Sequence, residues 1–277
     1  MSLKMSLNPE LAREFINIVG EIVDEIRLII TMNGIKVSAV DPANVALIIL
    51  DLPKDNFLSY EFEASDNWTS SIDGHYTGVL QENIAVGIDV LKIKEFLDIS
   101  EGEVVLIEEL RDPVEFTFSV DTLEMRQGMF YRKIKLLPEN SIRKAPKIPM
   151  LHLDYKVQLD TLEFMRITKK AAKVSDYIML GFSREDADVI FTARASDGDE
   201  LPWQATKHMF NWQCLRDDAR LSSSSLFLLD YLVDIMPKIP SDKVWLHIGQ
   251  DYPCKLSFVL GQTGTVEYLQ APRIEGD

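Results

Sequence analysis

The sequence predicts an α+β protein of two similar domains, each built from antiparallel strands with its helices on one face. Near mid-chain, residues 136–149 hold three prolines, which remove backbone donors and push the preceding residues towards extended conformations. On both sides of this segment, the order helix, strand, turn and strand occurs twice. We therefore expect domains at residues 1–135 and 152–277, joined by an extended connector at residues 136–151.

The repeat is clearest towards the end of each half. Residues 112–118 resemble residues 252–258, because each segment has proline in second place and then alternates apolar with polar positions. At the same separation along the chain, Val104 corresponds to Val244. Ungapped agreement of this kind over about thirty residues indicates an internal duplication.

The first half is expected to begin with a helix over residues 8–22, because Asn8 suits the N-cap and Pro9 the first turn. A second helix is predicted from Val90 to about Asp98. Strands are expected where apolar residues alternate or run together, at residues 25–30, 35–40, 45–52, 84–89 and 129–135 and at two places in 99–120. Residues 64–83 are rich in turn-forming residues and are predicted to form an exposed excursion.

The second half repeats this plan with helices predicted over residues 160–174 and 226–238. Its strands are expected at residues 177–182, 189–193 and 266–269 and, as more than one strand, within 243–260. Residues 198–225 show no clear period and are predicted to be irregular.

Composition limits the class of protein. The chain has 277 residues, of which 46% are apolar and 26% charged, as in ordinary globular proteins. It holds two cysteines and neither a signal segment nor an apolar run of the ~20 residues that span a bilayer, so an intracellular protein is expected. A net charge of −15 argues against a surface covered by DNA-binding side chains, although a local basic face remains compatible with it.

Enzyme motifs are absent from the sequence. The histidines are too scattered for paired metal ligands; they are His75, His152, His208 and His247. There is no glycine-rich phosphate loop and no Gly-x-Ser-x-Gly elbow. The acidic run at residues 196–200 is interpreted as a solvated loop. We therefore expect no catalytic residue, no cofactor and no metal, although a site assembled from scattered residues is not excluded by sequence alone.

Four segments together resemble one family. They are residues 39–47, the connector ending in Lys147-Ile148-Pro149, residues 251–258 and the tail at residues 269–275. In this order, along nearly the whole chain, they resemble the DNA sliding clamps of archaeal or eukaryotic type, the proliferating cell nuclear antigen family. The location implied is the cytoplasm for an archaeal protein and the nucleus for a eukaryotic one.

The resemblance implies a DNA polymerase processivity factor with the DNA-clamp fold. Clamps of this family are trimeric rings, with helices lining the hole and sheets forming the outer wall. The ring encircles double-stranded DNA without sequence specificity and serves replication and repair. DNA polymerase, clamp loader, nuclease and ligase dock on it through short peptides, and no membrane is involved. A homotrimer is expected; the alternative is a subunit of a heterotrimeric or checkpoint-type clamp.

The resemblance also places a peptide pocket beneath the connector. Its residues are Val40, Val45, Leu47, Ile148, Pro253, Ala271 and Pro272. Apolar residues from distant segments often converge on such a groove. On the residues alone, Val45 and Leu47 are equally well explained as strand core. Leu269 and Gln270 differ from the aromatic and leucine residues found there in many family members.

The DNA-facing residues implied are Arg13, Lys92, Lys94, Arg166, Lys169, Lys170, Lys173 and Lys238. Four of them recur at helical spacing within residues 160–174 and share one side of that helix. Such a stripe suits contact with phosphates rather than bases, and a solvated helix face is the alternative. The helices at 8–22 and 226–238 are not basic, so the contact with DNA is expected to be loose and uneven.

Ring closure in this family pairs two edge strands from neighbouring subunits. By position, residues 114–120 and 188–195 are expected to be these edges. Burial of exposed edges in a ring removes the risk of pairing with other chains.

Overall fold

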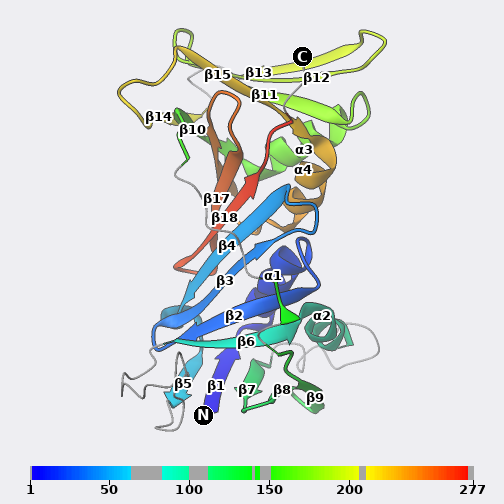
Figure 1. Ribbon diagram of the computed structural model, residues 1–277, viewed down its shortest axis with the longest axis vertical. Coiled ribbons are helices and arrows are strands. Elements are labelled where there is room, and N and C mark those ends of the chain that lie inside the picture. The colour runs from blue at the N-terminus through cyan, green and yellow to red at the C-terminus, as the bar shows by residue number, and fades with distance from the viewer. Residues whose placement is uncertain are drawn as a thin grey trace. The chain divides into compact units, whose positions relative to one another are not determined.

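The computed structural model describes residues 2–63, 83–99, 112–138, 141–143, 151–205 and 210–273 (Figure 1). The chain forms two compact units. Unit 1 comprises Met1–Ala39, Ile49–Ala145 and Leu260–Gly264, and unit 2 comprises Val40–Ile48, Pro146–Val259 and Thr265–Asp277. A short segment of each half therefore belongs to the unit formed mainly by the other half.

The described residues of unit 1 form two sheets, two α-helices and one short 3-10 helix. Its elements are β1 (Ser2–Leu7), α1 (Pro9–Gly20), β2 (Glu25–Thr31), β3 (Gly34–Val40), the second part of β4 (Ala46–Pro53), η1 (Lys54–Asn56), β5 (Ser59–Glu63), β6 (Asn83–Asp89), α2 (Val90–Ile99), β7 (Val114–Phe118), β8 (Thr122–Gln127) and β9 (Phe130–Lys135). One sheet has the order β5-β1-β7-β8-β9, and the other has the order β6-β2-β3 followed by β4. The pairing is antiparallel between β1 and its neighbours β5 and β7, between β2 and its neighbours β3 and β6, and between β8 and its neighbours β7 and β9.

Unit 2 repeats this plan. Its elements are β10 (Tyr155–Asp160), α3 (Thr161–Ala171), β11 (Tyr177–Ser183), β12 (Asp188–Arg194), β13 (Glu200–Ala205), β14 (Asn211–Cys214), β15 (Ser222–Leu228), α4 (Leu229–Ile235), η4 (Met236–Lys238), β16 (Lys243–Ile248), β17 (Cys254–Leu260) and β18 (Gly264–Gln270). One sheet has the order β14-β10-β16-β17-β18, followed by the part of β4 that belongs to unit 2. The other has the order β13-β12-β11-β15.

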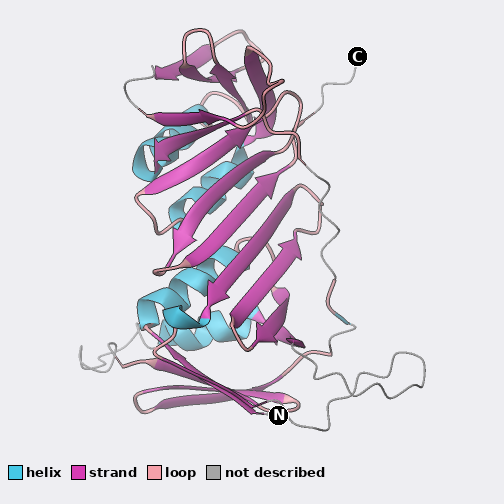
Figure 2. Cartoon of the chain, turned by 90° about the vertical axis from the view of Figure 1, so that its left-hand side faces the viewer, coloured by secondary structure: helices cyan, strands magenta, loops and turns pink. Residues whose placement is uncertain are grey.

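The duplication and the α+β class predicted from the sequence are confirmed. In each unit the helices pack as a pair, α1 with α2 and α3 with α4. Figure 2 shows each pair (cyan) against one face of the strands (magenta) of its unit. The first helix also begins where the sequence predicts, since Asn8 Oδ1 accepts a hydrogen bond from Glu10 N at 2.8 Å and Pro9 opens α1.

The predicted alignment of 112–118 with 252–258 is wrong by one strand. In the sheet orders, β7 lies between β1 and β8, as β16 lies between β10 and β17. The strand that follows Pro113 therefore corresponds to β16, whereas the strand that follows Pro253 is β17. A turn with proline before an alternating strand recurs at many turns, so the likeness marks two similar turns rather than equivalent strands.

The predicted edge strands are also wrong. β7 has β1 and β8 as neighbours, and β12 has β11 and β13, so both lie inside their sheets. Among the described residues, the outermost strands are instead β5, β6 and β9 in unit 1 and β13, β14 and β15 in unit 2. Edge position depends on which strands pair across the fold, and the sequence of a single strand does not carry that information.

Residues 198–225, predicted to be irregular, form β13, β14 and the start of β15. Pro202 lies within β13, where it is tolerated because an outer strand needs hydrogen bonds on one side only. The predicted excursion at 64–83 falls almost entirely outside the described residues, as does the predicted strand around Val104. No helix in the described part of the chain has the length and apolar character needed to cross a membrane.

Candidate functional site

The turn between β3 and β4 is organised by one buried carboxylate. Asp41 is only 6% exposed. Its Oδ1 accepts hydrogen bonds from Val45 N at 2.7 Å and Ala46 N at 2.8 Å, and its Oδ2 accepts one from Ala43 N at 3.1 Å. The backbone closes the same turn, because Asp41 N donates to Ala46 O at 3.0 Å. The turn is therefore held by the Asp41 side chain as well as by its own backbone.

The C-terminal tail is joined to this turn. Ala271 N donates a hydrogen bond to Val45 O at 2.8 Å, directly after β18 ends. Two residues later, Arg273 N donates to Leu226 O at 2.7 Å, and the Arg273 guanidinium lies over the Tyr177 ring at 4.2 Å. The tail is thus held by backbone hydrogen bonds at Ala271 and at Arg273, and Ala271 lies next to the turn.

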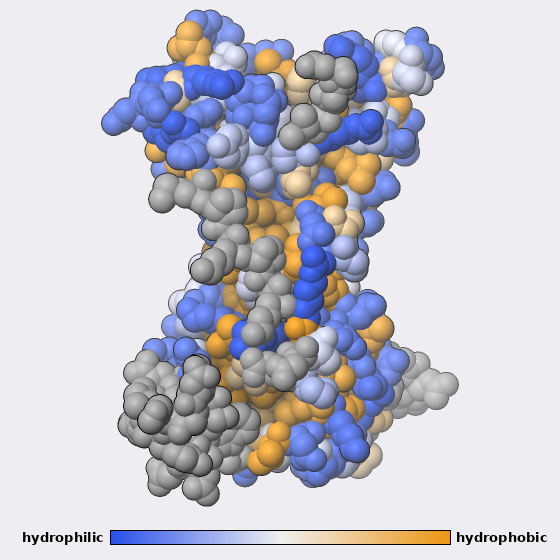
Figure 3. Space-filling view, in the orientation of Figure 1, coloured by the Kyte–Doolittle hydropathy of each residue, from blue (hydrophilic) through white to orange (hydrophobic). Residues whose placement is uncertain are grey.

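The predicted pocket residues are partly brought together. Val45 and Ala271 are neighbours through their backbones and both are partly exposed, as are Pro272 and Pro253. Val40 and Leu47 are almost buried, so they form the floor rather than the rim of any such surface. Ile148 lies outside the described residues. Figure 3 shows apolar residues (orange) at the surface over the strands β17 and β18 that Figure 1 places there.

The basic residues predicted on the helix over residues 160–174 share an exposed side of α3 and the turn after it. Those residues are Arg166, Lys169, Lys170 and Lys173. None of them forms an ion pair with any other residue that the structure describes. Lys169 and Lys170 lie in the last turn of α3, where the helix dipole favours positive charge. The stripe therefore carries uncompensated positive charge.

The other predicted DNA-facing residues are less available. Lys92 is paired with Asp89 at 2.9 Å, and Lys94 on the same helix is partly buried. Arg13 in α1 and Lys238 in η4 are partly buried as well. Of the four helices, α3 alone presents a run of exposed and unpaired cations among the described residues.

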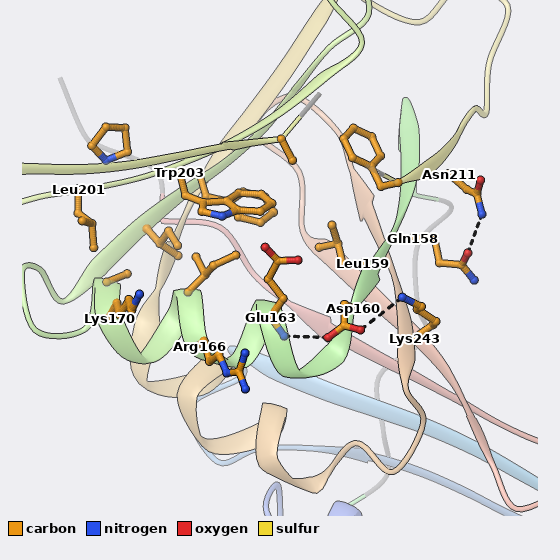
Figure 4. Close-up of a pocket in the computed structure, with 17 residues that line it drawn as sticks. Gln158, Leu159, Asp160, Glu163, Arg166, Lys170, Leu201, Trp203, Asn211 and Lys243 are labelled. Atoms are coloured by element: carbon orange, nitrogen blue, oxygen red, sulfur yellow. Dashed lines mark hydrogen bonds and ion pairs between the residues drawn. The ribbon is translucent and has the colours of Figure 1, made fainter. Parts of the chain in front are cut away.

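A cavity of about 1010 Å³ lies between α3 and β13 in unit 2 (Figure 4). Trp203 of β13 stacks on Phe191 of β12, with ring centroids 5.1 Å apart. Figure 4 shows the Glu163 carboxylate pointing from α3 towards Trp203. This cavity was not expected, because residues 200–205 were not predicted to form a strand. The alternation of Leu201 with Trp203 was the available signal.

The described residues that most resemble catalytic groups are chemically quiet. Burial lowers the pKa of His247 to about 3, with further lowering from Lys255 and Lys156, so the ring is neutral at ordinary pH. Its Nε2 is hydrogen-bonded to Ser257 Oγ at 2.8 Å. Burial raises the pKa of the Cys254 thiol to about 12, which removes it as a nucleophile. No cluster of possible metal ligands occurs in the part of the chain that the structure describes.

The sequence is similar along its whole length to curated archaeal proteins. It is 32% identical over 278 residues to the DNA polymerase sliding clamp of Methanococcoides burtonii, covering 99% of each chain. It is also 32% identical over 275 residues to the DNA polymerase sliding clamp of Methanothrix thermoacetophila, again covering 99% of each chain. No protein-family model matches the sequence.

Solved structures of the same kind share the fold. One is A. fulgidus PCNA bound to the C-terminal region of FEN-1, with a TM-score of 0.80 and 28% identity, covering 99% of this chain and 100% of that one. PCNA from Thermococcus kodakaraensis has a TM-score of 0.79 at 22% identity, covering 98% of this chain and 100% of that one. The second likeness bears on the fold alone.

Proposed function

Because the chain belongs to the family of DNA polymerase sliding clamps, we propose that it is a processivity factor that encircles double-stranded DNA and tethers replication and repair enzymes. The observation that carries this proposal is the full-length similarity to clamps, in which neither chain has an unmatched domain. The duplicated topology agrees with it, because the same sheet order occurs in both units.

We propose that partner proteins dock a short peptide on the surface formed by the 41–46 turn and the tail. Val45 and Ala271 supply its centre, and Pro272 and Pro253 supply apolar rim. A PCNA of this fold has been solved with the C-terminal region of FEN-1 bound, which supports a nuclease as one partner. DNA polymerase, ligase and clamp loader are proposed to use the same surface.

DNA is proposed to pass the exposed side of α3. The four cations there are unpaired, whereas Lys92 is neutralised by Asp89. Contacts from flexible lysines to phosphates hold the duplex without reading its sequence. Weak contacts from one helix of each subunit suit a protein that must slide.

We propose that three copies close the ring through β9 and β13. Within unit 2, β18 lies beside the part of β4 that belongs to that unit. When the two repeats are aligned, β9 corresponds to β18 and β13 corresponds to β4. Among the described residues, β9 and β13 are each the last strand of their sheet. Pairing of β9 with β13 of a second copy therefore repeats between subunits a junction that already exists in the chain.

The charges on these two edges are complementary. β9 carries basic residues and no acidic one; they are Arg132, Lys133 and Lys135, of which Arg132 is paired with Glu95 and Lys133 with Glu124. β13 and the turn before it carry acidic residues and no basic one; they are Asp197, Asp199 and Glu200, of which Glu200 is paired with Arg194 of β12. This favours a homotrimer, because one chain holds both halves of the contact. A subunit of a heterotrimeric or checkpoint-type clamp remains the second candidate.

No catalytic activity is proposed for the chain itself, and an intracellular location is proposed with its role in replication. Light scattering across a dilution series tests the assembly: a species near three times 31.6 kDa is expected for a homotrimer. A stable monomer that trimerises only with other clamp chains contradicts it and favours the second candidate.

Primer extension tests the function directly. The polymerase and clamp loader of Methanococcoides burtonii are suitable, because the clamp of that organism is 32% identical to this chain. Long products that require both the loader and this chain are expected on a primed single-stranded circle. Products of unchanged length with and without the chain contradict the proposal.

A further inference from the structure

The buried carboxylate of Asp41 has a partner far away in the sequence. Its Oδ2 accepts a hydrogen bond from Tyr231 Oη at 2.9 Å, in addition to the longer bond from Ala43 N at 3.1 Å. Tyr231 lies on α4, and both residues belong to unit 2. The carboxylate that shapes the turn is therefore engaged from the turn on one side and from a helix on the other.

Tyr231 is itself fixed in place. It is partly buried, and its carbonyl oxygen accepts a hydrogen bond from Tyr268 Oη at 3.4 Å. Burial raises the pKa of the Tyr231 hydroxyl, and the neighbouring Asp41 raises it further. The hydroxyl therefore stays protonated at neutral pH and remains a donor to the carboxylate.

We propose that Tyr231 is a positioning residue for the peptide-binding surface, acting through Asp41. This rests on the proposed function, in which the 41–46 turn and the tail receive partner peptides. Hydrogen bonds to an ionised acceptor are short and directional, so four donors hold the two oxygens of Asp41 in one orientation. Loss of the Tyr231 hydroxyl removes the shorter of the hydrogen bonds from Tyr231 and Ala43 to Oδ2 and frees the carboxylate to turn.

Val45 carries the effect from the carboxylate to the surface. Its N–H donates to Asp41 Oδ1 at 2.7 Å, and its carbonyl accepts from Ala271 N at 2.8 Å. A small rotation of the Asp41 side chain therefore displaces Val45, and with it the contact between the turn and the tail. The Tyr231 hydroxyl donates its hydrogen bond to Asp41 and not to the proposed rim, so its influence on binding is indirect.

The test compares Tyr231→Phe with the unchanged chain, using a synthetic peptide of the FEN-1 C-terminal region as probe. We expect the peptide to bind Tyr231→Phe about tenfold more weakly by calorimetry, the size of effect that loss of one hydrogen bond to a charged acceptor produces. The matched control is Tyr155→Phe, which removes another hydroxyl in unit 2, one that donates to Arg220 O away from the turn. Peptide affinity is expected to stay within twofold of the unchanged chain in that control.

A double-mutant cycle separates positioning from general loss of stability. In an Asp41→Asn background, Tyr231→Phe is expected to change peptide affinity less than twofold, since the carboxylate it orients is gone. Equal affinity of the unchanged chain and Tyr231→Phe, or an equal loss in both backgrounds, overturns the proposal.

The proposal and the proposed function fail in different ways. If the unchanged chain does not bind the peptide, peptide docking at this surface is contradicted. The positioning role is then judged by amide chemical shifts of the free protein. Shifts of Val45 and Ala46 in Tyr231→Phe, absent in Tyr155→Phe, support it, and unchanged shifts overturn it.

Discussion

Two turns occupy the same place in the duplicated topology and are built differently. The first joins β3 to β4 and the second joins β12 to β13. Their backbones are similar, although the first turn is one residue longer. Asp41 N donates to Ala46 O and Asn44 N to Asp41 O, whereas Ala195 N donates to Asp199 O and Gly198 N to Ala195 O. Asn44 and Gly198 also share a positive φ, of 60° and 97°.

The side chains make the difference between the two turns. Asp41 is buried and binds the backbone of its own turn, whereas Ala195 at the corresponding place has no side chain that can do so. The second turn is instead exposed and acidic, with Asp197 Oδ1 accepting from Asp199 N at 3.2 Å. Similar turns thus support the proposed peptide surface in one unit and the proposed assembly edge in the other.

The largest expected effect comes from removing the side chain that locks the first turn. Asp41→Ala is expected to lower the free energy of unfolding by about 3 kcal/mol, because it leaves buried N–H groups without their charged acceptor. Asp197→Ala, in the exposed turn, is expected to change it by less than about 0.5 kcal/mol. Urea unfolding of both variants measures the contrast, and equal losses would break the distinction between the two turns.

Assembly offers the next contrast, between β9 and β13. Reversing Lys135 (Lys135→Glu), the basic residue of β9 that forms no ion pair with another described residue, is expected to weaken the trimer about tenfold, because a like charge then faces the acidic edge. Reversing Asp199 and Glu200 to lysine is expected to do the same. A mixture of the two variants should recover trimers, since one pair of complementary edges is restored. Light scattering that shows unaltered trimers in each variant alone contradicts the assignment of these edges.

The first helices of the two units give a smaller contrast, in charge alone. The two helices can be aligned at their N-caps, which are Asn8 for α1 and Asp160 for α3. In this alignment, the basic residues Arg166 and Lys173 correspond to the acidic residues Glu14 and Glu21. Neutralising Lys169 and Lys170 to glutamine is expected to weaken DNA binding and reduce the slope of log affinity against log salt by up to about two, if both contact phosphate.

Removing a negative charge from α1 provides the matched control for removing positive charges from α3. Glu14→Gln is expected to leave that slope unchanged, because no phosphate contact is removed. Fluorescence anisotropy with a short duplex at several salt concentrations measures both variants. A slope that is insensitive to Lys169 and Lys170 would show that the α3 face is a solvated surface.

What the sequence predicted well is local, and what it missed depends on distant pairing. Asn8 and Pro9 mark a helix start by their own chemistry, and α1 begins there. Residues 198–225 show no clear period, so β13 was not predicted, and the tolerance of Pro202 within β13 depends on this strand being outermost in its sheet. β7 and β12 were predicted to be edge strands from their positions in the family resemblance. In the structure, each of them pairs with a strand on both sides.

The candidate site was predictable to a similar degree. Val45 and Ala271 could be placed together only through the family resemblance, and the structure joins them by a backbone hydrogen bond. The Asp41-Pro42 pair predicts a turn from local chemistry. The hydrogen bond from Tyr231 to the Asp41 carboxylate joins residues that are far apart in the chain, so no local pattern reveals it.

The smallest expected effect concerns the two N-caps. Asn8→Ala and Asp160→Ala are each expected to cost ~1 kcal/mol of stability near neutral pH, since each removes a cap from the first turn of its helix. The two caps should respond differently to acid. The hydrogen bond from Glu163 N holds the pKa of Asp160 below its ordinary value, and Lys243 lowers it further.

A carboxyl group whose pKa is lowered by folding stabilises the fold above its unfolded pKa, and this contribution is lost as the pH falls through the lowered value. The cap of α3 should therefore weaken below about pH 4, the usual range of an aspartate, whereas the amide cap of α1 should not change. Unfolding by urea between pH 6 and pH 2 measures this. The difference in stability between the unchanged chain and Asp160→Ala should shrink on acidification, while that for Asn8→Ala should stay constant. If the stability loss has the same pH dependence in both variants, the charge of the Asp160 carboxylate adds nothing to its action as a cap.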